Sequence, residues 1–232
     1  MTKPIAVAHR GAPMRARENT LDGLRMAQRL GADWIEADVK TTADGVPVLL
    51  HDETLARLWG VAAPVATLPL REVTGLRGPG GERIPTLAET VAVMAPSGTV
   101  LLIDLSDERV AHAVVTDAAV LAHPATVAFT GASGALAVVR EAFEEATVLL
   151  TWESWGFPGA GLLARVRPQF LNVDGRFIDE DLIATARAKG LLVGVYTLDR
   201  PGHIRTAIGL GLDAIISNDI ELLRALIDET AP

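Results

Sequence analysis

The sequence predicts a single α/β domain, folded as a (β/α)8 (TIM) barrel with a small insertion after the second strand. Short apolar runs with strand character alternate along the whole chain with segments whose apolar residues recur at helical spacing. A length of 232 residues suits one barrel domain. Eight strands with helical partners favour a closed barrel over an open, doubly wound sheet.

Each strand is predicted from a short apolar run. These runs lie at 5–8, 34–38, 100–105, 126–129, 148–152, 170–173, 192–196 and 214–217. Helices are predicted at 20–30, 107–122, 136–146, 161–166 and 181–189, with one more after each of the last two strands. In the first helix, Thr20 has the side chain of an N-cap and Gly31 suits the position just after the C-terminus.

The segment 54–85 interrupts the alternation. It is rich in Pro and Gly, and only 70–76 has the pattern of an ordered element. In a barrel it would follow the second strand at the face where active sites lie, and long irregular segments there are often functional. We therefore expect a cap over the substrate; a passive surface loop is the alternative.

Composition excludes several classes of protein. The chain has 49% hydrophobic residues, no cysteine and a formal net charge of −8. The missing cysteines exclude disulfides and thiolate sites, and the negative charge argues against a nucleic-acid surface. No apolar run approaches the roughly 20 residues of a membrane span, and residues 1–4 leave no room for a signal peptide before the first strand. We expect a cytoplasmic enzyme with a small-molecule substrate and no stable membrane insertion.

Residues suited to metal-assisted phosphoryl chemistry cluster near the N-terminus. Glu36 and Asp38 alternate along one predicted strand, so their carboxylates face the same side, as a site for Mg²⁺ or Ca²⁺ requires. His9 and His51 follow apolar runs, and their side chains titrate near neutrality, as a general acid and base must. Arg10 offers a forked donor to a phosphoryl oxygen. Taken singly, these residues could merely end strands; together they predict an active site.

The spacing of these residues resembles that of the glycerophosphodiester phosphodiesterase family. The matching motifs run in register over about fifty residues and continue more weakly towards the C-terminus. They are His9-Arg10-Gly11, Glu18-Asn19-Thr20, Gly31-Ala32-Asp33-x-x-Glu36-x-Asp38-Val39, Thr42-x-Asp44-Gly45-x-Pro47-Val48, His51-Asp52, Ile84-Pro85-Thr86-Leu87-x-Glu89, Val195-Tyr196-Thr197-Leu198 and Gly211-x-Asp213-x-Ile215-Ile216.

The resemblance implies a barrel enzyme that uses a divalent metal ion to hydrolyse glycerophosphodiesters to sn-glycerol 3-phosphate and an alcohol. It assigns acid–base catalysis to His9 and His51, and metal binding to Glu36 and Asp38. Glu18 and Asn19 are then expected to support the active site, with helix capping as the alternative.

The third strand departs from the family pattern. There the family has Glu-x-Lys, in which Glu binds metal and Lys contacts phosphate, whereas this chain has Asp104-Leu105-Ser106. We expect Asp104 to be the third metal ligand and Lys40 to be the candidate replacement for the missing lysine. Tyr196 stands where the family often has Trp, and Trp152 and Glu153 lie at the end of the fifth predicted strand, within reach of substrate.

The missing lysine leaves two alternatives open. One is a catalytically weakened barrel that binds phosphoesters, and the other is a related phospholipase D-like enzyme that acts on lysolipids. The head group, the preferred metal and the oligomeric state are not predicted.

Overall fold

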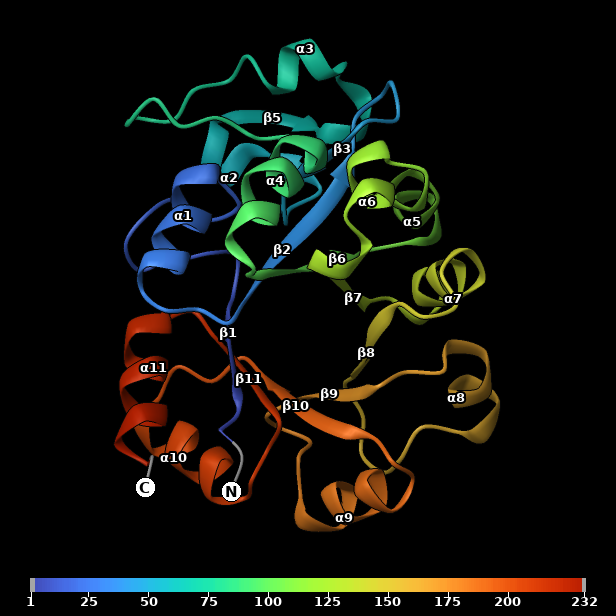
Figure 1. The fold of residues 1–232 in the computed structure, drawn as a ribbon. Coiled ribbons are helices and arrows are strands. Elements are labelled where there is room, and N and C mark those ends of the chain that lie inside the picture. Colours follow the sequence, from blue (N-terminus) through green and yellow to red (C-terminus); the bar gives the residue numbers. More distant parts are fainter. Residues whose placement is uncertain (1–2, 231–232) are drawn as a thin grey trace.

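The structure is a computed structural model that describes residues 3–230, and within them eight parallel strands form a closed barrel (Figure 1). Strand β1 pairs with β2 on one side and with β11 on the other, which closes the ring. The predicted (β/α)8 barrel is therefore confirmed. Its strands are β1 (Ile5–Ala8), β2 (Trp34–Thr41), β6 (Val100–Leu105), β7 (Val127–Gly131), β8 (Thr147–Trp152), β9 (Phe170–Asp174), β10 (Leu192–Tyr196) and β11 (Ala214–Ser217).

Helices surround the barrel and follow each of its strands (Figure 1). Thr20 Oγ1 accepts the Gly23 N–H and so starts the first helix, as predicted. The helices are α1 (Leu21–Arg29), α4 (Leu87–Met94), α5 (Glu108–Val115), α6 (Ala118–Ala122), α7 (Ser133–Ala142), α8 (Ala160–Val166), α9 (Glu180–Ala188), α10 (Pro201–Gly209) and α11 (Ile220–Glu229).

Two helix predictions need correction. The single helix expected over 107–122 is two helices: the first ends at Val115, and Asp117 caps the second by accepting the N–H groups of Ala119 and Val120. The helix expected over 136–146 lies earlier, at Ser133–Ala142. None of the helices within residues 3–230 is both long and apolar enough to cross a bilayer.

The strands separate two apolar layers because successive side chains point to opposite faces. On β6, Ile103 packs outward against the helices, whereas Leu102 points into the barrel. The barrel interior is filled by Val7, Leu102, Ala128, Leu149, Phe170, Ala214 and Ile216. The polar side chains at the strand ends therefore lie above a packed apolar interior, and the barrel formed by residues 3–230 has no open pore beneath them.

The insertion is ordered, so the expectation that only 70–76 has regular structure is wrong. Strand β2 turns back through the antiparallel β3 (Pro47–Leu49). The chain then forms β4 (Thr54–Leu55), α2 (Ala56–Trp59), β5 (Val61–Pro64), the 3-10 turn Val65–Thr67 and α3 (Leu70–Val73). A separate apolar cluster that includes Leu55, Trp59 and Val65 holds it together. Elements of two to four residues are too short to produce a recognisable sequence period.

Candidate active site

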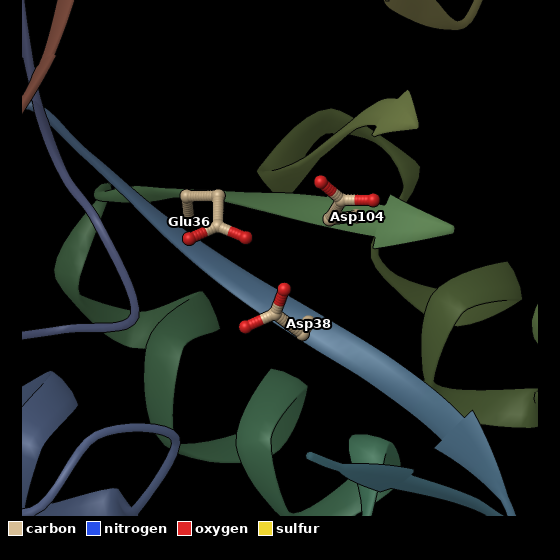
Figure 2. Close-up of side chains that lie close together, drawn as sticks. All are labelled: Glu36, Asp38 and Asp104. Atoms are coloured by element: carbon tan, nitrogen blue, oxygen red, sulfur yellow. The ribbon is translucent and has the colours of Figure 1, made fainter. Parts of the chain in front are cut away.

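Three carboxylates from two neighbouring strands converge at the C-terminal end of the barrel. Glu36 and Asp38 point inward from β2, and Asp104 lies beside Asp38 in the β2–β6 register. One ligand atom from each of the three lies within 4.8 Å of the others. Figure 2 shows the three side chains directed towards a common space. The alternation predicted for positions 36 and 38 is therefore observed, and the pairing of β2 with β6 adds position 104.

The negative charge of this cluster is offset only in part by the protein, through Arg10 beside Asp38. Burial, together with Asp38 and Asp104, raises the pKa of Glu36 well above its ordinary value. Burial and Asp38 likewise raise the pKa of Asp104 to about 7. Glu36 Oε2 accepts the backbone N–H of Arg10 at 2.8 Å, but Glu36 Oε1 is buried without a hydrogen-bond partner. An unpartnered carboxylate oxygen among like charges fits a hard divalent cation.

Gly131 makes room for Asp104. A side chain at this position, where φ is +115°, would place its Cβ 2.7 Å from Asp104 Oδ1 and would collide with the Leu105 carbonyl oxygen. Only glycine therefore allows the end of β7 to approach the carboxylate this closely. Nothing in the local sequence pattern identified this position.

Asn19 holds Asp38 from the first loop. Its Nδ2 donates to Asp38 Oδ2 at 2.8 Å, and its Oδ1 accepts the Asp38 backbone N–H at 3.2 Å. Thr20, not Asn19, provides the side-chain cap of α1. Of the two alternatives for Asn19, the structure thus places it in contact with a candidate metal ligand.

His9 lies at the end of β1 with one ring nitrogen fixed. Its Nδ1 lies 2.8 Å from Asn218 Oδ1, and an amide oxygen can only accept, so Nδ1 carries the proton. Asn218 is oriented in turn by its Nδ2, which donates to Asp199 Oδ2 at 2.7 Å. Burial and Arg10 lower the pKa of His9, which favours a neutral ring with a free lone pair on Nε2.

His51 follows β3 and is more exposed. Its Nδ1 donates to Asp52 Oδ1 at 2.7 Å. Hydrogen bonds from Arg57 and His51 lower the pKa of Asp52 to about 2, so its carboxylate is ionised and can balance the charge of an imidazolium. The two histidines thus have different surroundings: a neutral amide at His9 and a carboxylate at His51.

Arg57, on α2 of the insertion, connects Asp52, which contacts His51, with Glu18, which contacts Arg10. It donates two hydrogen bonds to Asp52, at 2.6 and 3.1 Å, and two to Glu18, at 3.1 and 2.7 Å. Glu18 accepts from Arg10 at 3.2 Å, and Arg10 Nε lies 3.2 Å from Asp38 Oδ2. Arg57 could not be identified from the sequence because it lies in the segment that has no periodic pattern.

Comparison with known proteins shows to which family the chain belongs. The Glycerophosphoryl diester phosphodiesterase family matches residues 9–132, which is more than half of the chain. The chain belongs to this family. It is thereby an enzyme of the phosphoric diester hydrolase class.

Relatives and solved structures of this family match the chain over nearly its full length. A glycerophosphodiester phosphodiesterase of Caldanaerobacter subterraneus subsp. tengcongensis is 26% identical, over 97% of this chain and 98% of that protein. A phosphodiesterase of Oleispira antarctica, solved with the product sn-glycerol-3-phosphate, has a TM-score of 0.87 and 26% identity over 97% of both chains. The glycerophosphodiester phosphodiesterase of Thermotoga maritima has a TM-score of 0.83 and 25% identity, over 97% of this chain and 99% of that one.

The remaining predicted residues lie around the carboxylates in different settings. Lys40 is nearly buried, and its Nζ donates to Glu53 Oε1 at 2.5 Å. Tyr196 donates from its hydroxyl to Glu153 Oε1 at 2.9 Å. Trp152 packs against the outer apolar layer, with its indole N–H bonded to the Gly156 carbonyl. Ser106 is exposed and donates to Asp107 at 3.3 Å.

Replacing Arg57 by Ala should lower kcat/KM about tenfold, because Asp52 and Glu18 lose the cation that orients them. Steady-state kinetics on a glycerophosphodiester measures this, and added guanidinium should restore part of the loss. Arg71→Ala, which removes an exposed arginine of α3 in the same insertion, is the matched control. Unchanged kinetics in Arg57→Ala would show that both carboxylates keep their positions without it.

Proposed function

We propose that this protein hydrolyses glycerophosphodiesters to sn-glycerol 3-phosphate and an alcohol, with Mg²⁺ or Ca²⁺ held by Glu36, Asp38 and Asp104. The observation that carries the proposal is the buried carboxylate cluster with an unpartnered oxygen, in a chain of this family. The product complex of the Oleispira antarctica phosphodiesterase supports the choice of substrate. Action in the cytoplasm on a small-molecule substrate is part of the same proposal.

A phosphodiester resists hydrolysis because its negative charge repels nucleophiles and its alkoxide leaves poorly. A bound divalent ion supplies charge neutralisation at the phosphoryl oxygens. The guanidinium of Arg10, held between Glu18 and Asp38, is positioned to donate to a phosphoryl oxygen. Glu18 and Asn19 support this arrangement through Arg10 and Asp38.

The surroundings of the two histidines suggest a division of roles. His9 is kept neutral with its proton on Nδ1, so Nε2 can take a proton as general base. His51 faces an ionised carboxylate through Nδ1, so its ring can hold a second proton on Nε2 and give it to the leaving alcohol.

The insertion is proposed to act as a cap. The bonds from Arg57 to Glu18 and Asp52 tie the insertion to residues that contact Arg10 and His51. A passive surface loop would not require hydrogen bonds to residues that contact Arg10 and His51.

The products identify the reaction. Incubation of the metal-loaded enzyme with glycerophosphocholine should release choline and sn-glycerol 3-phosphate in equal amounts, each detected by a specific coupled assay. Release of phosphocholine and glycerol would contradict the proposal. Turnover of lysophosphatidylcholine alone would indicate the phospholipase D-like alternative, and binding without any turnover would indicate the weakened barrel.

Ser106→Lys should raise kcat/KM roughly tenfold to a hundredfold, since a charge-assisted contact to phosphate is worth about 1.5–3 kcal/mol. Ser106→Gln, of similar length without charge, is the control. Lys40→Ala should lower kcat/KM if Lys40 already serves the phosphate, although its ammonium group is bonded to Glu53. If none of these variants changes kcat/KM threefold, the phosphate is held by other residues.

A further inference from the structure

A polar cleft opens beside Asp104, on the side of the carboxylate cluster away from β1. It has a volume of about 410 Å³ and lies at the C-terminal ends of β6, β7 and β8. Because Asp104 forms part of its wall, a group attached to a phosphate at the carboxylate cluster can reach into it. The lining side chains include Asp104, Ser106, Ser133, Thr151, Trp152 and Glu153.

The cleft contains one carboxylate outside the proposed metal site, that of Glu153. Among the described residues that line it, the ionisable ones are Asp104 and Glu153, and both are acidic. The guanidinium of Arg176 is bound to Asp174 by two side-chain hydrogen bonds, at 2.9 and 2.7 Å. Within residues 3–230 Glu153 has no ion-pair partner, and its side chain is exposed.

Glu153 is held in place although it is exposed. Its Oε1 accepts the hydroxyl of Tyr196 at 2.9 Å. Burial and Glu153 both raise the pKa of Tyr196, so the phenol keeps its proton and remains the donor. Trp152 also lines the cleft, and its indole is fixed by the hydrogen bond from its N–H to the Gly156 carbonyl.

We propose that this cleft receives the alcohol arm of the diester and selects a head group with a positive charge, an ammonium or quaternary ammonium, through Glu153. The carboxylate of Glu153 attracts such a cation, and the aromatic side chain of Trp152 can add a cation–π contact. The hydroxyl groups of the lining can accept hydrogen bonds from an ammonium group. An uncharged polyol would gain only hydroxyl contacts there. The inference rests on the proposed function and makes Glu153 a specificity-determining residue.

The test compares substrates that share the glycerophosphate half. kcat/KM of the metal-loaded enzyme is measured for glycerophosphocholine and glycerophosphoethanolamine, and for the uncharged glycerophosphoglycerol and glycerophosphoinositol. Glu153→Gln, whose amide oxygen can still accept from Tyr196, should lower the ratio of cationic to uncharged substrates about tenfold. Its kcat/KM for glycerophosphoglycerol should stay within about twofold of the unmodified enzyme.

Two further variants sharpen the result. Glu153→Lys should lower the ratio further, because it places a cation beside the head group. Glu141→Gln, which neutralises an exposed carboxylate in the last turn of α7, is the matched control and should leave the ratio unchanged.

An equal loss for all four substrates, or an unchanged ratio in both Glu153 variants, would overturn the inference and leave the proposed function standing. Absence of turnover with every diester would overturn the proposed function, and this inference with it.

Discussion

Removal of divalent metal by excess EDTA should abolish phosphodiesterase activity, and Mg²⁺, Mn²⁺ or Ca²⁺ should restore it. The reason lies in the carboxylate cluster. Glu36 Oε1 has no hydrogen-bond partner, and three acidic side chains share one buried space. No basic side chain donates a hydrogen bond to Glu36 or Asp104 within residues 3–230. The cluster therefore needs a cation to be fully ionised at neutral pH.

The same cluster predicts a pH dependence of stability. The pKa of Asp104 is raised from an ordinary value of 3.8 to about 7 in the folded, metal-free protein. A carboxyl group with a raised folded-state pKa favours folding while protonated, and this contribution is lost as pH rises from about 4 through 7. The rise in Tm on adding metal should therefore be larger at pH 8 than at pH 5.

Asp104→Asn provides the control for both measurements. It removes one of the repelling charges, so the metal-free variant should be less sensitive to pH over the same range while it binds metal more weakly. Calorimetry of Mg²⁺ and Ca²⁺ binding shows this without reliance on turnover. Full activity of the unmodified protein in excess EDTA would exclude the metal site from the reaction.

Replacement of His9 or His51 by Ala should lower kcat on the order of 10² to 10⁴, the usual contribution of a positioned acid or base. The fold should survive because both residues lie at strand ends on the polar face of the barrel rather than in its apolar layers. Circular dichroism checks the fold, and steady-state kinetics on glycerophosphocholine checks the rate. His203→Ala, at an exposed position of α10, is the matched control.

A substrate with an activated leaving group separates the two roles. A p-nitrophenyl ester of glycerol phosphate needs little help from an acid, because nitrophenolate leaves without a proton. His51→Ala should therefore lose far less activity on this ester than on glycerophosphocholine, whereas His9→Ala should lose a similar factor on both. The opposite pattern would exchange the assigned roles, and a variant that keeps most of its turnover on both substrates would remove that histidine from the mechanism.

Local patterns in the sequence predicted the strands that support the site. For Glu36 and Asp38 the two-residue period of a strand alone places both carboxylates on one side. Short apolar runs also placed His9 and His51 at strand ends, and the family motifs added Asp104. Such positions can be predicted because a strand's period and a motif's spacing depend on residues a few positions apart.

Tertiary structure alone decided what surrounds these residues. Asn218 lies 209 residues from His9 in the chain, and they meet because β1 pairs with β11 when the barrel closes. Arg57 reaches Glu18 and Asp52 only because the insertion folds around its own apolar cluster. Glu153 faces the cleft through a bond to Tyr196 on another strand. Such contacts depend on barrel closure and loop folding, and neither leaves a period in the sequence.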